Sequence, residues 1–291
     1  WQLLIELTLL DAEQDFTINA VELSTQRPDT GSRIIGGSAT TIENYPYTVQ
    51  ILYYMQLICA GSLLTSRNVL SAAHCFVDQR GVVARPSSFA VRVGTSNLNT
   101  GGEVHRVSAI IVHERYNQPE RDNDIALVLL STAVRLSNRV QIAKIPVAGA
   151  ELLDDSEVVV VGWGRTNANI AAASPILNQV SVRTVNRTAC AQRYGWLETI
   201  SGDPYPITDN MLCAGLWNQG GADACQGDSG GPLIYGDIVV GVTSWGYGCA
   251  ERLFPGVYAK VSRYTTWANH TVRPHVCDTT RFLHNNGCRL S

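Results

Sequence analysis

The sequence predicts an all-β protein, a β-barrel or a β-sandwich, on two observations. Short apolar runs rich in β-branched residues recur from residue 34 onward, and Gly, Pro and Asn separate them, which is typical of strands joined by turns. Helical periodicity is scarce, and its best candidate is 262–269, with Ser262 as the N-cap. The clearest strand candidates are 47–54, 89–93, 107–112, 158–162 and 238–245.

Size, hydropathy and charge exclude two broad classes of protein. The chain has 291 residues, of which 45% are hydrophobic, so it can bury a large core and is near the upper size of a single all-β domain. Apolar runs such as 158–161 and 238–242 have the length of strands and are far too short to span a bilayer. The net charge of −3 lacks the basic excess that nucleic-acid binding requires. We therefore expect neither a membrane nor a nucleic-acid partner.

A leader precedes the large domain. Residues 1–33 contain no cysteine and end in the polar stretch 25–33, which includes Pro28 and Gly31. This composition predicts a loosely ordered segment. Residues 1–10 are apolar but include Glu6 and lack a basic flank, so we do not interpret them as an intact signal peptide.

The cysteines predict disulfides. There are eight, an even number, and eight cysteines allow 105 different pairings. No CxxC spacing is present, so a disulfide framework is a better interpretation than a zinc site. Disulfides indicate an oxidising compartment and hence a secreted protein. Asn186 and Asn269 each begin an Asn-x-Thr triplet, which fits secretion as a glycoprotein.

The basic residues are almost all arginine. Of 22, only Lys144 and Lys260 are lysine. Lysine loses its charge near pH ~10, whereas arginine holds its charge above about pH 12. The bias would keep the surface charge constant in an alkaline lumen. Codon or lineage drift explains it nearly as well.

Three short segments bear the marks of chemistry. They read LSAAHC at 70–75, DNDIAL at 122–127 and DACQGDSGGP at 223–232. Together, in this order and spacing, they resemble the chymotrypsin/trypsin family of serine proteases over about residues 34–270. The segment 36–46 also looks like insect trypsins.

The resemblance implies a fold and a domain organisation. The fold is two six-stranded antiparallel β-barrels followed by a C-terminal helix. Residues 1–33 would be an activation propeptide and 34–270 the peptidase domain. Residues 271–291 extend past the family's usual end, and their role is open.

The residue types of the three segments suit nucleophilic catalysis. A serine hydroxyl is a poor nucleophile at neutral pH and needs a base. Histidine titrates near neutrality, so it can take and return the proton, and a buried carboxylate orients the imidazole. By resemblance Ser229 is the nucleophile, His74 the base and Asp124 the orienting carboxylate. The nearby Asp122 we interpret as a solvated loop charge.

Two further sets of residues follow from the resemblance. The N–H groups of Gly227 and Ser229 would form the oxyanion hole, since a glycine lets the backbone turn its N–H toward the substrate. Asp223 would lie at the floor of a specificity pocket and pair with an arginine or lysine of the substrate. The other pocket residues would be Ala224, Ser244, Trp245, Gly246 and Gly256.

The family pattern also implies disulfide pairings. They are Cys59–Cys75, Cys190–Cys213 and Cys225–Cys249. Cys277 and Cys288 are left over, and we expect them to pair with each other.

We expect no metal and no cofactor. The other histidines match no family site, and a surface or structural role is expected for His105, His113, His270, His275 and His284. Some trypsins bind calcium in the loop that corresponds to 94–103. Here Thr95 stands where such members begin with a glutamate, and Glu103 is the only carboxylate, so hard oxygen ligands are too few.

The segment RIIGG at 33–37 resembles the family's activation junction. Cleavage after Arg33 would release a new N-terminus at Ile34, and its ammonium would pair with Asp228. The expected function is therefore a secreted, monomeric serine endopeptidase that is made as a zymogen and cleaves after arginine or lysine. Its partners would be protein or peptide substrates and protein inhibitors.

The sequence also argues against two other functions. A catalytically silent binding homologue would have lost a residue of the triad or the oxyanion glycine, and none is missing. A regulatory cascade protease often carries cysteine-rich modules before the catalytic domain. Residues 1–33 contain no cysteine, which favours digestive or general proteolysis.

Overall fold

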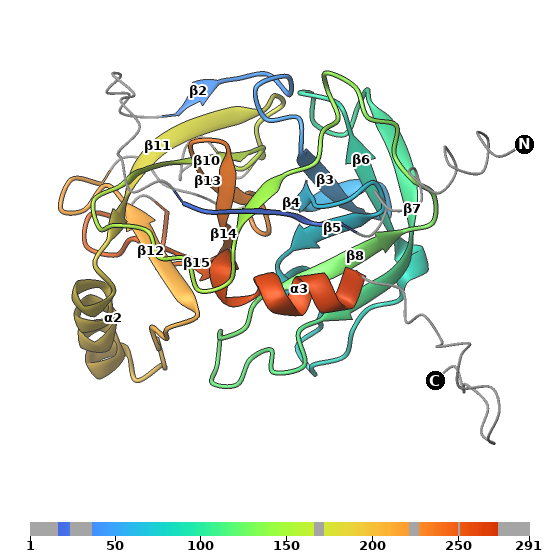
Figure 1. The fold of residues 1–291 in the computed structure, drawn as a ribbon. Helices are drawn as coiled ribbons and strands as arrows, with labels where there is room; N and C mark the ends of the chain where they lie inside the picture. The colour runs from blue at the N-terminus through green and yellow to red at the C-terminus, as the bar shows by residue number, and fades with distance from the viewer. Residues whose placement is uncertain (1–16, 24–36, 166–171, 221–226, 250, 273–291) are drawn as a thin grey trace, which may run out of the picture.

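The computed structural model describes residues 17–23, 37–165, 172–220, 227–249 and 251–272. Two β-barrels make up most of this part, with the first barrel on the right and the second on the left of Figure 1. The first is a closed ring of six antiparallel strands in the order β3-β4-β5-β8-β7-β6. Its strands are β3 (Thr48–Tyr53), β4 (Gln56–Leu63), β5 (Asn68–Ser71), β6 (Phe89–Val93), β7 (Glu103–Val112) and β8 (Ala126–Leu130).

The second barrel also has six antiparallel strands. They follow the order β14-β13-β10-β11-β12-β15, and pairing of β14 with β15 closes the ring. The strands are β10 (Glu157–Gly162), β11 (Asn178–Val185), β12 (Met211–Gly215), β13 (Pro232–Tyr235), β14 (Ile238–Trp245) and β15 (Gly256–Lys260). The predicted fold class is confirmed, and each of the five strand candidates falls on a strand.

One apolar cluster joins the two barrels. It contains Ile51 and Leu63 from the first barrel and Val161 and Val242 from the second, all at most 1% exposed. A fully buried aliphatic side chain contributes about 1.5–3 kcal/mol to folding. The barrels therefore share a core, which holds the loops at their junction in a fixed relation.

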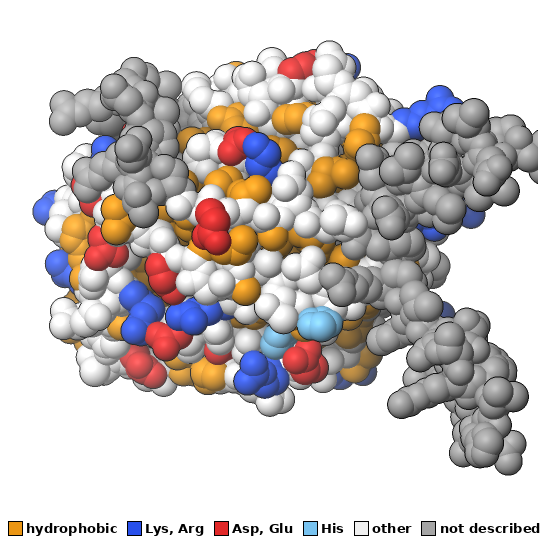
Figure 2. All heavy atoms as spheres, in the orientation of Figure 1, with side chains coloured by type: hydrophobic (Ala, Val, Ile, Leu, Met, Phe, Trp, Pro, Cys, Tyr) orange, Lys and Arg blue, Asp and Glu red, His pale blue; other side chains and the backbone are white. Residues whose placement is uncertain are grey.

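Two α-helices lie outside the barrels. The helix α3 (Thr265–Val272) begins three residues later than the predicted 262–269. Ser262 is not its N-cap, because Ser262 is buried in a preceding 3₁₀ turn, η3 (Val261–Arg263), where its carbonyl accepts from the N–H of Gly149. The other 3₁₀ turns are η1 (Ala73–Cys75) and η2 (Pro86–Ser88). Figure 2 shows the face that carries α3, with charges of both signs scattered around a band of apolar side chains.

The sequence reading missed α2 (Arg187–Ser201). Asn186 caps it by accepting from the N–H of Ala189 at 3.1 Å, and Gly202 ends it with a φ of +79°. Its buried residues are Cys190, Tyr194 and Leu197, a spacing of four and three that fits one helix face. The Asn-x-Thr triplet at Asn186 predicts only a glycosylation acceptor and not this N-cap. No helix among the described residues is long and apolar enough to cross a membrane.

Three short strands extend the sheet of the second barrel. β2 (Ser38–Ala39) pairs with β11, while β9 (Lys144–Pro146) pairs in parallel with β14. β1 (Asn19–Val21) pairs in parallel with β9. The prediction of a loosely ordered leader is therefore wrong for residues 17–23, because this short stretch has apolar side chains that pack on the protein. The remainder of the leader lies outside the described residues.

Candidate active site

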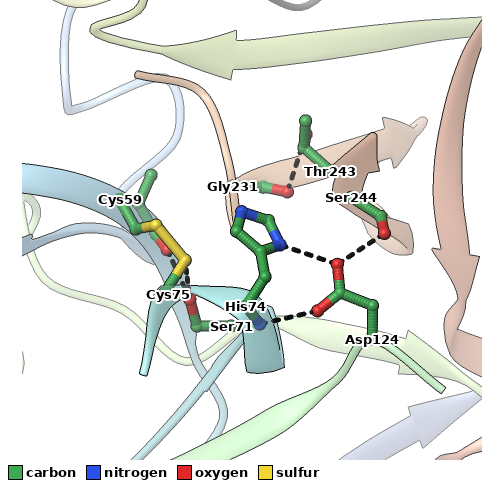
Figure 3. Close-up of a disulfide and its surroundings, with 9 residues drawn as sticks. Cys59, Ser71, His74, Cys75, Asp124, Gly231, Thr243 and Ser244 are labelled. Carbon is green, nitrogen blue, oxygen red and sulfur yellow. Dashed lines mark hydrogen bonds and ion pairs between the residues drawn. A yellow bond between two sulfur atoms is a disulfide. The ribbon is translucent and has the colours of Figure 1, made fainter. Parts of the chain in front are cut away.

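The predicted base and its predicted carboxylate lie just beyond the ends of two neighbouring strands of the first barrel. His74 lies in η1, directly after β5, and Asp124 lies two residues before β8. Because Ser71 of β5 pairs with Ala126 of β8, these two segments are adjacent. The His74 Nδ1 atom lies 2.7 Å from Asp124 Oδ2, and the His74 backbone N–H donates to Asp124 Oδ1 at 2.8 Å (Figure 3). Two bonds thus set the orientation of the imidazole.

A third bond to this carboxylate comes from the second barrel. The hydroxyl of Ser244, at the end of β14, donates to Asp124 Oδ2 at 2.5 Å (Figure 3). Asp124 is 4% exposed. Burial alone would raise its pKa, but the charge of His74 and the hydrogen bonds from His74 and Ser244 outweigh burial and hold the pKa below its usual value. Asp124 therefore stays ionised and can only accept.

The ionised carboxylate determines the state of the imidazole. Since Asp124 is an acceptor, the Nδ1 of His74 carries the proton and Nε2 is left to act as a base. Burial lowers the pKa of His74, but the carboxylate charge and hydrogen bond of Asp124 outweigh it and raise the pKa above its ordinary value of 6.5. The His74 side chain keeps 33% of its surface exposed, so a substrate can reach it.

The loop of the predicted nucleophile is anchored to the first barrel. The carbonyl of Ser229 accepts from the N–H of Ala60 at 2.8 Å. Ala60 follows Cys59, whose disulfide joins Cys75, the neighbour of His74 (Figure 3). A short path of hydrogen bond and covalent bonds thus runs from the backbone of Ser229 to that of His74.

The glycines around Ser229 are required by the backbone. Gly227 has a φ of +104° and Gly230 a φ of +76°, values that side chains rarely allow. A Cβ on Gly227 would lie 2.9 Å from the Cα of Gly164, and one on Gly230 would lie 2.2 Å from the Oγ of Ser71. These contacts explain why glycines flank Ser229. They fit the predicted oxyanion role of Gly227, which stays a prediction.

Asp228 lies in a cage lined by glycine. It is 8% exposed, and its carboxylate accepts from the N–H of Gly164 at 2.8 Å. A Cβ on Gly162 or Gly164 would lie about 2.1–2.2 Å from its oxygens. The carboxylate thus occupies space that any other residue at 162 or 164 would fill.

Part of the predicted pocket is described. Gly246 and Gly256 face each other, because a Cβ on Gly246 would lie 3.7 Å from the Cα of Gly256. Ser244 is buried and Trp245 is half-buried, with its ring 4.9 Å from that of Tyr194. Asp223 and Ala224 lie outside the described residues.

The cationic side chain of Arg121 lies over Trp245 of the predicted pocket, a contact that the sequence analysis did not predict. The guanidinium of Arg121 is 5.0 Å from the ring centre of Trp245 and 4.4 Å from that of Tyr205, within the range of cation–π attraction. Nothing in the local pattern of the sequence signals this contact. The three residues come from segments far apart in the chain.

The interpretation of Asp122 as a solvated loop charge is wrong. Asp122 is 4% exposed. Its carboxylate accepts from the hydroxyl of Thr208 at 2.9 Å and from the amide of Asn210 at 3.1 Å. Both donors lie just before β12 of the second barrel. Asp122 therefore ties the loop that carries Asp124 to the opposite barrel, a contact between distant segments that no local pattern shows.

Two of the predicted disulfides are confirmed. Cys59 pairs with Cys75, and Cys190 pairs with Cys213, which fastens α2 to β12. Cys249 is also disulfide-bonded. Its predicted partner Cys225, the predicted pair Cys277 and Cys288, and the activation residues Arg33 and Ile34 lie outside the described residues.

The other histidines that the structure describes have structural or surface positions. His105 is buried with Nδ1 3.1 Å from the hydroxyl of Thr132, and His113 packs against the rings of Tyr264 and Trp267. His270 is exposed. His275 and His284 lie outside the described residues.

The expectation of no calcium in the loop at 94–103 stays a prediction, and two side-chain contacts there agree with it. The guanidinium of Arg92 donates to the carbonyl of Gly101 at 2.6 Å, and the hydroxyl of Thr95 donates to the carbonyl of Thr100 at 2.9 Å. Two carbonyl oxygens of the loop are therefore already hydrogen-bonded to side chains. Cys59, His74 and Cys75 also cluster closely enough to hold a metal, but both sulfurs are committed to the disulfide.

Two barrels with this arrangement of His, Asp and Ser at their junction define a protein of the chymotrypsin-like serine hydrolase class. Residues 34–268 match the family model described as Trypsin. The chain therefore belongs to the trypsin family and is a serine endopeptidase.

Named relatives agree with this assignment. Trypsin CFT-1 of Choristoneura fumiferana is 42% identical over 245 residues, which cover 82% of this chain and 91% of that protein. Trypsin, alkaline C of Manduca sexta is 41% identical over 249 residues, 84% and 92% of the two chains. A trypsin of Phaedon cochleariae is 39% identical over 236 residues, 81% and 87%.

Replacing Asp122 by alanine should destabilise the fold by about 1–3 kcal/mol, because it leaves the half-buried donors of Thr208 and Asn210 without their acceptor. We also expect kcat to fall, since Asp124 follows on the same loop. Urea unfolding and active-site-normalised kinetics measure both. Glu120→Ala, an exposed change in the same loop, is the control and should stay within about 0.5 kcal/mol of the parent protein. An equally small effect for Asp122→Ala would contradict the inference that Asp122 ties its loop to the second barrel.

The pH dependence of kcat/KM should show the raised pKa of His74. The ring acts as a base only when neutral, and Asp124 favours its protonated form. Activity is therefore full above the raised pKa and is lost as pH falls through it, with a midpoint above 6.5. Initial rates on a small arginine amide measure the acidic limb of the pH profile, and circular dichroism checks that the protein stays folded. A midpoint at or below 6.5 would contradict the inferred influence of Asp124.

Proposed function

We propose that the chain is a secreted trypsin-like endopeptidase that cleaves after arginine, and after lysine less well, through a covalent acyl-enzyme. The observation that carries the proposal is the Asp124 carboxylate. It holds the His74 imidazole at 2.7 Å and also accepts from Ser244 of the other barrel. These contacts support the proposal that His74 is an oriented base at the barrel junction, where the loop of Ser229 is anchored.

The residues divide the chemistry as follows. His74 Nε2 takes the proton of the Ser229 hydroxyl as the oxygen attacks the scissile carbonyl. The N–H groups of Gly227 and Ser229 stabilise the oxyanion, and each such donor is worth about 3–4 kcal/mol in the transition state. The imidazolium then protonates the leaving amine. Water, activated by the same base, releases the acyl group and restores Ser229.

The pocket sets the preference for a basic side chain. The facing glycines 246 and 256 leave room for a long side chain, and Asp223 would supply the counter-charge. Ala224 stands where many trypsins have a serine. Alanine cannot help to solvate a lysine ammonium, whereas the fork of arginine can still pair bidentately with Asp223.

Activation would follow from a cut between Arg33 and Ile34. The free ammonium of Ile34 would pair with Asp228, whose carboxylate the cage of Gly162 and Gly164 already positions. Burial of the isoleucine side chain favours insertion, and the carboxylate offsets the cost of burying the charge. Because Arg33 suits the enzyme's own pocket, autoactivation or activation by another trypsin-like protease is expected.

A digestive role in an alkaline lumen fits the charge pattern. Two features support it. Both lysines are ion-paired, Lys144 with Asp237 and Lys260 with Glu151, and relatives from Manduca sexta are named alkaline trypsins. The Ile34 ammonium sets an upper limit. Pairing raises its pKa above the free value near ~8, and the active form is lost as pH rises through that raised pKa.

Ser229→Ala should lower kcat by several orders of magnitude while leaving the fold intact, since it removes the nucleophile. The parent enzyme should react stoichiometrically with a covalent serine-directed inhibitor, and the variant should not. Thermal unfolding serves as the control for folding. Near-normal turnover in the variant would show that another residue is the nucleophile.

Ala224→Ser should narrow the preference for arginine over lysine, because the added hydroxyl can solvate an ammonium. The measurement is kcat/KM on matched peptide substrates that differ only in the residue before the cleaved bond. Equal values for arginine and lysine in the parent enzyme would count against the role given to Ala224.

Arg33→Gln should leave the precursor intact and inactive. In the Ser229→Ala background, a trace of active enzyme should cut the Arg33 precursor, and N-terminal sequencing should read Ile-Ile-Gly-Gly. Full activity in uncut Arg33→Gln protein would refute the activation mechanism.

A further inference from the structure

The leader contributes a strand to the peptidase domain. Asn19, Ala20 and Val21 of β1 pair in parallel with Lys144, Ile145 and Pro146 of β9. The N–H of Val147 donates to the carbonyl of Val21 at 2.8 Å and continues this ladder. In Figure 1 the dark blue segment crosses the front of the molecule above α3.

Side chains on β1 and beside it enter the core. Ile18 is 6% exposed and belongs to the cluster shared by the two barrels, with Ala20 packed against it. Val21 and Leu23 pack on the separate cluster of the second barrel. Leu23 also lines a cavity of about 240 Å³ together with Pro146 and Leu152. The leader therefore covers two apolar clusters that would otherwise be more exposed to solvent.

The position of β1 in the sheet also favours its contact with β9. β9 lies between β1 and β14 in the strand order. Without β1, β9 would become an edge strand with exposed N–H and C=O groups, which proteins usually cover. Addition of a strand to such an edge is a recurrent mode of peptide binding.

The proposed activation cut leaves this contact whole. Arg33 lies C-terminal to 17–23, so hydrolysis after it breaks no bond within β1 or between β1 and β9. Residues 1–33 contain no cysteine, so no disulfide could retain them. Cleavage does turn an intramolecular contact into one between two chains, which lowers its effective concentration.

We propose that the leader stays bound to the activated enzyme without a covalent link, as a strand on β9, so that the active form is a complex of two chains. This inference rests on the proposed activation at Arg33. The leader is then a permanent part of the second barrel. Its loss would uncover the β9 edge, Ile145 and the apolar surface now beneath Ile18 and Leu23.

The test is cleavage of the full-length Ser229→Ala precursor with added trypsin. The only basic residues in 1–33 are Arg27 and Arg33, so trypsin leaves 17–23 within one fragment. Size-exclusion chromatography at micromolar concentration, followed by intact-mass measurement, should find the leader fragment in the enzyme peak. Denaturant should release it. N-terminal sequencing reports the cut at Ile34 independently.

Two variants probe the contact and one controls it. Ile18→Asp places a charge in the core, and Val21→Pro disrupts the strand. In either variant we expect the amount of retained leader to fall by about tenfold or more. The free energy gained by burying one aliphatic side chain exceeds the free energy that corresponds to a tenfold change in Kd. Glu22→Gln changes an exposed residue of the same segment and should retain the leader as the parent does.

The outcomes separate the two proposals. A correct cut at Ile34 with the leader eluting apart from the parent enzyme would overturn retention and leave activation standing. Absence of a cut at Arg33 would overturn the activation proposal and retention with it. Equal retention in the parent protein, Ile18→Asp and Val21→Pro would show that β1 does not hold the leader.

Discussion

A buried carboxylate that must keep its charge is the constraint on which the site depends. Asp124 is almost completely buried, so its ionised form needs hydrogen-bond donors from the protein. His74 supplies two and Ser244 a third. Because Ser244 belongs to the other barrel, the carboxylate is satisfied only when both barrels are packed together. Burial and, beyond it, the charge of Asp124 also raise the pKa of Tyr116 to about 12, so the field of this carboxylate reaches past the triad.

The rest of the site is built around the same junction. The N–H of Ala60 donates to the carbonyl of Ser229. The adjacent Cys59 forms a disulfide with Cys75, the residue next to His74. Asp122 adds a second buried acceptor that spans the barrels through Thr208 and Asn210. Stability and site geometry are thus coupled: loosening the contact between the barrels would disturb the predicted base His74 and the predicted nucleophile Ser229 together.

Much of this could be predicted from the sequence because it is local. The alternation of β-branched runs and turns indicated the strands, and three segments marked the positions of His74, Asp124 and Ser229. The failures involve either contacts between distant segments or weak local signals. The sequence suggests a loop charge at Asp122 because the side-chain donors Thr208 and Asn210 lie more than eighty residues away. β1 is three residues long and forms only against β9, and α2 has just three buried residues on one face.

The central claim is that Asp124 sets the protonation of His74, and NMR titration of the His74 ring nitrogens tests it most directly. Ser229→Ala protein, with and without Asp124→Asn, avoids autolysis during the experiment. With Asp124 present we expect Nδ1 to stay protonated and the ring pKa to lie above 6.5. With asparagine, burial acts unopposed and the pKa should fall below that value. The same ring pKa in both proteins would contradict the claim.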